Sequence, residues 1–187
     1  MEKYIFLFVS FLVWHKISAL PDEDNMTTPQ IIKYNKYPVE THKVRTDDGY
    51  ILTMFRIPHG RHGRTKTKGV FYLQHGFLGS STNYVTNLPR RSLAFTLADA
   101  GYEVWLGNSR GTSYSIEHEF LSVDSEKYWD FSHDEMAEYD FPAMVNYVVQ
   151  TSDHQQLYYV GHSQGKSFEH RVAFSILFQF IHKTSIS

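Results

Sequence analysis

The sequence predicts an α/β fold, in which a mostly parallel β-sheet carries helices on its faces. Strand-like and helix-like segments alternate in the order β-β-β-α-β-α-β-α, which is typical of doubly wound sheets. An apolar run without polar alternation, residues 70–73, indicates a strand that is buried on both faces. With 187 residues, the chain is long enough for one domain of ordinary size.

The composition excludes several classes of protein. The chain has 18 Lys and Arg residues against 20 Asp and Glu, and the formal charge of -2 gives no basic field for nucleic acid. Hydrophobic residues make up 42% of the chain, which is enough to build a core and excludes disorder of the whole chain. Because there is no Cys, disulfides, a thiol nucleophile and Cys-type zinc sites are excluded, which leaves Ser, Asp, Glu and His for catalysis.

The first residues have the pattern of a secretory signal. The apolar run 4–14 has the length of the apolar region of such a signal and is too short to span a bilayer. We expect residues 1–19 to be a signal peptide that is cleaved after Ala19, and residues 20–37 to be a polar leader segment. Asn25, in Asn-Met-Thr, is then a predicted glycosylation site. The expected location is secreted or lysosomal, with no transmembrane segment beyond the signal.

A β-hairpin opens the predicted domain, which we assign to residues 38–165. Segments 39–45 and 50–57 have strand patterns and flank a turn at residues 46–49. The run 70–73 follows as a central strand of the parallel sheet.

Helices and strands then alternate. Leu93, Leu97 and Ala100 recur at helical spacing, and Gly101 ends that helix. The next expected elements are, in order, a strand over 102–107, a polar excursion over 108–132, a helix from about 134 to 150 that Pro142 bends, and a strand over 156–160.

A G-x-S-x-G motif at residues 161–165 follows the last predicted strand. A nucleophile elbow requires its serine in a strained turn between a strand and a helix, and the residues two positions to either side must be small. We therefore predict Ser163 as a nucleophile, with Gly161 and Gly165 as elbow glycines. His162 is interpreted as a structural elbow residue, because the direct neighbour of the serine points elsewhere.

A serine nucleophile also needs donors for the oxyanion that forms during acyl transfer. His75 and Gly76, at the end of the strand 70–73, are interpreted as the oxyanion loop. The backbone N–H groups of Phe77 and Gln164 are the expected oxyanion hole.

The histidines at positions 75, 118, 133 and 162 offer a metal site as the alternative use. No H-E-x-x-H or comparable pairing occurs in the chain. We predict no metal and no cofactor.

Several segments together resemble the acid lipase family of gastric and lysosomal acid lipases, within the α/β-hydrolases. They extend from about Pro38 to Gly165 and comprise residues 48–52, 75–81, 97–105, 107–111, 134–140 and 158–165. The resemblance implies the N-terminal part of an α/β-hydrolase fold, with hydrolysis of triacylglycerols or cholesteryl esters by Ser163. It implies a neutral lipid or a lipid–water interface as partner, and a downstream Asp and His as the other triad members.

The chain departs from that family after the elbow. The triad order in α/β-hydrolases is Ser, then Asp or Glu, then His. After Ser163 the histidines are His170 and His182 and the acidic residue is Glu169, and none is expected to reach the serine. We therefore expect an incomplete and inactive ester hydrolase. The alternatives are a non-catalytic secreted lipid-binding or decoy protein, and an esterase or thioesterase of another α/β-hydrolase class.

Residues 166–187 are expected to be a divergent tail and not the evolved continuation of the fold. Lys166 places a cation at a helix N-terminus, where the helix dipole disfavours it. The codons of Gly165 to Ser167 are compatible with a consensus splice donor, so the tail is interpreted as translated non-coding sequence. The alternative is a diverged elbow helix near the end of a fragment. The strand over 156–160 would then form an exposed edge and make the product poorly soluble.

Overall fold

The computed structural model describes residues 25–63, 66–172 and 181–183. Its strands are β1 (Glu40–Arg45), β2 (Tyr50–Ile57), β3 (Val70–Gln74), β4 (Glu103–Gly107), β5 (Glu117–His118), β6 (Leu157–Gly161) and β7 (Ile181–Lys183). Its α-helices are α2 (Thr28–Tyr34), α3 (Leu93–Asp99), α4 (His133–Glu135), α5 (Phe141–Thr151) and α6 (Gln164–Val172). Three 3₁₀-helices, η2 (Ser81–Tyr84), η3 (Pro89–Arg91) and η4 (Glu126–Trp129), and a π-helix, η5 (Met136–Asp140), complete the described elements.

The strands form one mixed sheet in the order β1-β2-β4-β3-β6-β7, with β5 beside β2. The hairpin prediction is confirmed, because β1 and β2 pair antiparallel. The central position of β3 is also confirmed, since it pairs parallel with β4 on one side and β6 on the other. Gln74 pairs with Gly107 and with Gly161, so three parallel strands end in one row.

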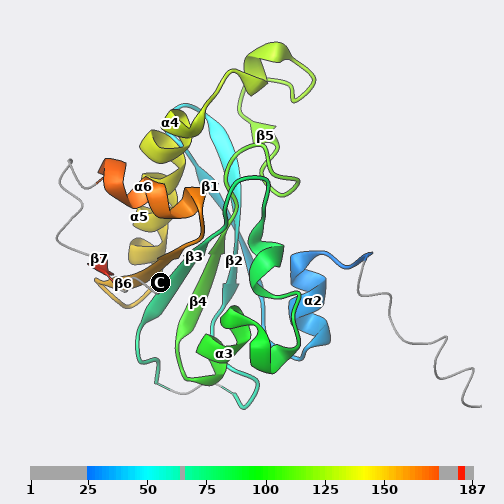
Figure 1. The fold of residues 1–187 in the computed structure, drawn as a ribbon, viewed down its shortest axis with the longest axis vertical. Helices are drawn as coiled ribbons and strands as arrows, with labels where there is room; N and C mark the ends of the chain where they lie inside the picture. Colours follow the sequence, from blue (N-terminus) through cyan, green and yellow to red (C-terminus); the bar gives the residue numbers. More distant parts are fainter. Residues whose placement is uncertain (1–24, 64–65, 173–180, 184–187) are drawn as a thin grey trace, which may run out of the picture.

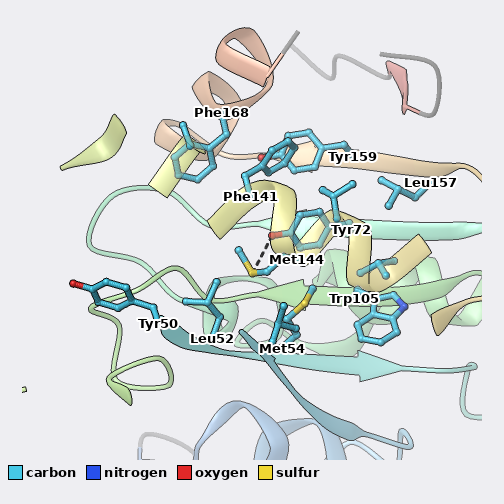
Figure 2. Close-up of a cluster of buried hydrophobic side chains, with 14 of the residues drawn as sticks. Tyr50, Leu52, Met54, Tyr72, Trp105, Phe141, Met144, Leu157, Tyr159 and Phe168 are labelled. Carbon is cyan, nitrogen blue, oxygen red and sulfur yellow. Dashed lines mark hydrogen bonds between the residues drawn. The ribbon is translucent and has the colours of Figure 1, made fainter. Parts of the chain in front are cut away.

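Helices cover both faces of the sheet, as Figure 1 shows. Helices α2 and α3 lie on one face, over a core that includes Ile32, Phe95 and Leu106. Helices α4, α5 and α6 lie on the other face, over a core rich in aromatic side chains. In that second core Phe141 packs edge-on against Tyr159 with ring centroids 4.9 Å apart (Figure 2). This arrangement is the α/β architecture that the alternation of elements predicts.

The leader segment contains a helix that the sequence pattern did not predict. Helix α2 buries Ile31 and Ile32 in the core, and Thr27 and Gln30 form a capping box at its N-terminus. The folded unit therefore begins before residue 38, and part of the segment 20–37 belongs to it. The predicted signal peptide lies outside the described residues.

The other departure concerns the edge of the sheet. Strand β7 pairs parallel with β6, with Ile181 opposite Leu157 and Lys183 opposite Tyr159. Helix α6 also places Phe168 in the aromatic core, where 1% of its surface is exposed (Figure 2). The expectation of an unpaired β6 edge is therefore wrong, and Phe168 packs as part of the fold.

Candidate active site

Ser163 lies in the turn between β6 and α6. Its φ angle is +52°, in the left-handed region that residues other than glycine rarely adopt. The helix begins at once, because the N–H of Gly165 donates to the carbonyl of His162 over 2.9 Å and that of Lys166 to the carbonyl of Ser163 over 3.0 Å. Ser163 is exposed. The strained turn therefore presents the serine to solvent, which is the arrangement of a nucleophile elbow.

The two glycines of the motif occupy positions without room for a side chain. A Cβ on Gly161 would lie 2.6 Å from the carbonyl carbon of Gly165. A Cβ on Gly165 would lie 2.8 Å from the carbonyl oxygens of both Gln74 and His75. These contacts are with backbone atoms, which cannot turn aside as a flexible side chain can. The close approach of β6, α6 and the end of β3 thus depends on both glycines.

The predicted oxyanion loop touches the elbow. A Cβ on Gly76 would lie 3.0 Å from the Cβ of Ser163 and 2.9 Å from Nδ1 of His162. His162 itself is exposed. The structure thus brings Gly76 and Ser163 together from elements 87 residues apart in the chain.

His75 is buried and both of its ring nitrogens are engaged. Its Nε2 accepts the backbone N–H of Ser109 over 3.2 Å, and its Nδ1 lies 2.8 Å from the carbonyl oxygen of Gly76. Burial lowers the pKa of His75 below the ordinary value, although the bond to Gly76 acts against this. A neutral imidazole with two partners is a structural group and cannot serve as a base for Ser163.

Two backbone donors remain open beside the serine. In the described part of the chain, no hydrogen bond is formed by the N–H of Phe77 or by that of Gln164. Phe77 and Leu78 are both exposed, and Leu78 has a φ angle of +55°. The unpaired N–H groups, next to strained backbone at Leu78 and at Ser163 itself, can donate to the oxygen of a tetrahedral intermediate.

Among the histidines whose side chains the structure describes, at positions 42 to 162, none is hydrogen-bonded to Ser163. His182 is paired in register with Tyr158, three residues before the end of β6, which is roughly 10 Å down the strand. His133 does contact a serine, but this is Ser167, whose Oγ lies 2.7 Å from Nε2 of His133. Among the described residues, the site thus has a candidate nucleophile and oxyanion donors without a base.

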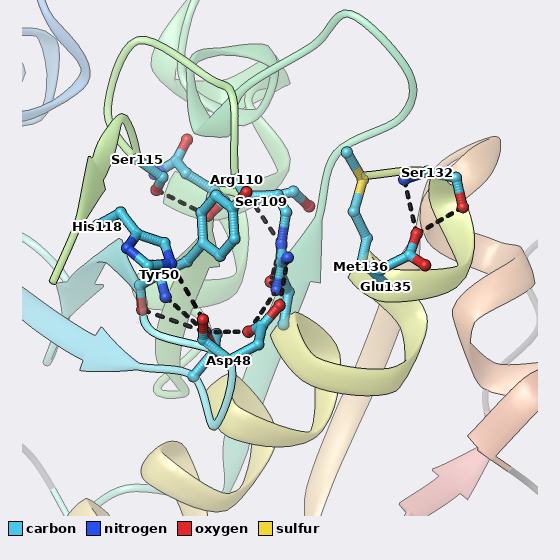
Figure 3. A network of polar contacts seen from close by, with 12 residues as sticks. Asp48, Tyr50, Ser109, Arg110, Ser115, His118, Ser132, Glu135 and Met136 are labelled. Carbon is cyan, nitrogen blue, oxygen red and sulfur yellow. Dashed lines mark hydrogen bonds and ion pairs between the residues drawn. The ribbon is translucent and has the colours of Figure 1, made fainter. Parts of the chain in front are cut away.

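Sequence reasoning missed a buried polar network at the same end of the sheet. The guanidinium of Arg110 is fully buried and donates to Asp48 over 2.6 and 2.9 Å and to Asp140 over 2.7 Å. Figure 3 shows Arg110 beside the ring of Tyr50, whose centroid lies 3.8 Å from the guanidinium carbon. The signal for it was a polar run, residues 108–110, directly after a buried strand.

The pKa values of the two carboxylates in this network are shifted in opposite directions. Burial acts to raise the pKa of Asp48, but hydrogen bonds from Arg110 and Thr46 outweigh it, and the pKa lies below the ordinary value. Burial raises the pKa of Asp140 to about 6, although Arg110 opposes the change. The guanidinium of Arg110 therefore pairs with an ionised, partly buried carboxylate and with a fully buried one.

Asn25 is exposed and precedes α2. No group of three or more potential metal ligands lies together within the described residues. Within that same part of the chain, every helix is too short or too polar to cross a membrane.

Comparison with family models and known proteins agrees with this fold. Residues 28–88 match a partial alpha/beta-hydrolase lipase region, and residues 69–165 match the alpha/beta hydrolase fold. The esterase Pf2001 of Pyrococcus furiosus superposes with a TM-score of 0.57 at 17% identity, over 83% of this chain and 52% of that chain. The fold and the elbow define an α/β-hydrolase.

Relatives of higher sequence identity identify the family within the α/β-hydrolases. The lysosomal acid lipase/cholesteryl ester hydrolase of Homo sapiens is 51% identical over 80% of this chain and 38% of its own length. Lipase member M of Mus musculus is 42% identical over 98% of this chain and 45% of its own length. The chain belongs to the acid lipase family. It spans less than half the length of these two relatives.

The match to lipase member M extends into the tail, whose interpretation stays a prediction. Coverage of 98% leaves room for only a few unmatched residues, so the similarity continues past Gly165. Phe168, within the same tail, is buried in the aromatic core.

Proposed function

We propose that this chain carries the nucleophile and oxyanion hole of a lipase that hydrolyses triacylglycerols or cholesteryl esters. The observation that carries the proposal is the strained Ser163 turn, next to Gly76 and the open N–H groups of Phe77 and Gln164. The names of the lipase relatives support the substrate class. The signal-like N-terminus and the exposed Asn25 support entry into the secretory pathway.

The chemistry follows from these groups. The Oγ of Ser163 bonds to the ester carbonyl carbon, and the carbonyl electrons move onto oxygen, where the N–H groups of Phe77 and Gln164 donate to it. The C–O bond to the alcohol then breaks, and the alcohol leaves with a proton. Water cleaves the resulting acyl-serine ester, which releases the carboxylic acid and restores the serine hydroxyl. A histidine base normally carries these protons.

Because no histidine side chain that the structure describes, at positions 42 to 162, contacts Ser163, we predict very slow turnover from these residues alone. In a serine hydrolase, loss of the histidine alone lowers kcat by a factor of about 10⁶, while the oxyanion hole keeps a residual advantage over water. The lack of a described histidine side chain at Ser163 also favours a second candidate, a non-catalytic lipid-binding protein. The two candidates differ in whether Ser163 itself is reactive.

The test is covalent labelling with an alkyl fluorophosphonate at high concentration, followed by peptide mass spectrometry. The serine oxygen bonds to phosphorus, fluoride leaves and the hydroxyl proton passes to solvent. We expect the label on Ser163 and its loss in Ser163→Ala. It should be retained in Ser167→Ala, the matched control, because Ser167 lies in the helix that follows the turn and its hydroxyl is 2.7 Å from a histidine nitrogen. Labelling of exposed serines without preference for Ser163, or an unchanged pattern in Ser163→Ala, would support the non-catalytic candidate.

A further inference from the structure

The carbonyl oxygen of Gly76 lies within hydrogen-bond distance of two donors. Nδ1 of His75 is 2.8 Å from it, and the N–H of Gly79 donates to it over 3.0 Å. The peptide unit between Gly76 and Phe77 is planar, with its C=O and N–H pointing in opposite directions. Holding the carbonyl of Gly76 therefore also sets the direction of the Phe77 N–H.

The position of the proton on His75 follows from its other contact. The backbone N–H of Ser109 lies 3.2 Å from Nε2 of His75 and can only donate. Nε2 must therefore be the unprotonated nitrogen, and the neutral ring carries its proton on Nδ1, facing the Gly76 carbonyl. The imidazole thus has the tautomer that donates to Gly76.

Buried hydrogen bonds hold the segment that supplies this N–H. The side chain of Asn108 donates to the carbonyl of Thr53 over 3.0 Å and accepts the N–H of Ser81 over 2.8 Å. Asn108 is fully buried, and it connects β2 to the start of η2, just beyond the oxyanion loop. Both ends of the segment 75–81 therefore contact the same short stretch of chain, Asn108 and Ser109.

The next residue fixes this stretch from the other side. The backbone N–H of Arg110 donates to Oδ2 of Asp140 over 2.9 Å, and the Arg110 side chain is fully buried between Asp140 and Asp48. The hydroxyl of Ser109 accepts the side-chain N–H of Gln74 over 3.0 Å. The Ser109 N–H is thus held by contacts on both its neighbours and cannot easily reorient.

We propose that His75 is a positioning residue: the Ser109 N–H sets its tautomer, and its Nδ1–H orients the Gly76–Phe77 peptide so that the Phe77 N–H faces the oxygen that gains charge during attack by Ser163. The inference rests on the proposed function, because it assigns a role within that oxyanion hole. Under this proposal, the geometry of the oxyanion hole depends on the polar run 108–110, which follows β4.

The kinetic test compares fluorophosphonate labelling of Ser163 in the unsubstituted chain, His75→Leu and His75→Asn. Leucine fills the space without a donor, whereas asparagine restores a short side-chain N–H. We expect the maximal labelling rate of His75→Leu to fall about 10- to 100-fold with the half-saturating reagent concentration unchanged, and that of His75→Asn to recover in part. Equal maximal rates in all three chains would overturn the proposal.

A second measurement needs no reactivity at Ser163 and no variant that must fold. Long-range ¹H–¹⁵N NMR spectra of the full chain distinguish the two neutral tautomers of an imidazole. We expect His75 to carry its proton on Nδ1 throughout the range from neutral pH to about pH 5, where exposed histidines become charged. A proton on Nε2, or a charged ring at pH 5, would overturn the proposal even if Ser163 is labelled. If Ser163 is not labelled and the tautomer is as expected, the proposed function fails, and the role of His75 is reduced to holding the loop.

Discussion

The elbow around Ser163 is held by steric contact, whereas the oxyanion loop opposite it is held by hydrogen bonds. At the elbow, Gly161 and Gly165 let three backbone segments approach within distances that no Cβ tolerates. At the loop, the ring of His75 and the side chain of Asn108 join segments that lie about 30 residues apart in the chain. The glycines that allow the steric contact lie within five residues of each other, whereas the residues that form the hydrogen bonds lie far apart in the chain. Substitutions at the elbow and at the loop should therefore have different effects.

The largest expected effect is on the hydrogen-bonded side, from Arg110→Met. The change leaves the buried Asp140 without its guanidinium partner, and removal of one member of a buried ion pair typically costs about 3–5 kcal/mol. Urea denaturation should show this loss in the free energy of unfolding. The matched control is Lys43→Met, because Lys43 pairs with Glu117 at an exposed site, where a pair is worth about 0–1 kcal/mol. Similar losses in both variants would mean that the Arg110 network does not hold the loop segment.

The next effect is on the steric side, from Gly165→Ala. In an unhindered helix this change would stabilise by about 1 kcal/mol, because alanine has the higher helix propensity. Contacts with the carbonyl oxygens of Gln74 and His75 should reverse the sign and destabilise by about 1–3 kcal/mol. Lys166→Ala, at the adjacent exposed position, controls for helix propensity. A more stable Gly165→Ala chain in the same denaturation assay would refute the steric account of the elbow.

A smaller effect is the pH dependence of the buried network. The pKa of Asp140 is raised to about 6 in the folded chain, against about 4 for an unfolded aspartate, so the folded form takes up this proton first. Its contribution to stability should therefore grow as the pH falls from 7 to 5. His75, whose pKa burial lowers, contributes in the opposite direction in the same window.

Asp140→Asn isolates the first contribution. The unfolding free energy of the unsubstituted chain minus that of Asp140→Asn should rise between pH 7 and pH 5, as measured by urea denaturation at each pH. A constant difference would show that the carboxylate stays ionised, so that Arg110 dominates over burial at this position.

The features that the sequence could predict are local. The G-x-S-x-G motif, the hairpin around residues 46–49 and the apolar strand at 70–73 each carry their cause within a few residues, and the structure contains these features. Helix α2 had a local signal too, the capping pair of Thr27 and Gln30, but a polar context concealed it.

The features that could not be predicted depend on distant partners. Asp48 and Arg110 are 62 residues apart, and their ion pair is decided by how β2 lies beside β4. Ser109 meets His75 because β3 and β4 end in register, which the strand patterns alone do not specify. The edge of the sheet follows the same rule, since the three residues of β7 pair with residues of β6 that lie more than 20 positions earlier in the chain.

The central claim, that Ser163 and the N–H groups of Phe77 and Gln164 form one reactive site, is tested most directly by a crystal structure of the fluorophosphonate adduct. We expect phosphorus on the Oγ of Ser163 and the phosphoryl oxygen about 2.7–3.1 Å from both backbone nitrogens, as an oxyanion hole requires. An adduct on Ser163 whose phosphoryl oxygen points to solvent, or an adduct on another residue, would contradict the account.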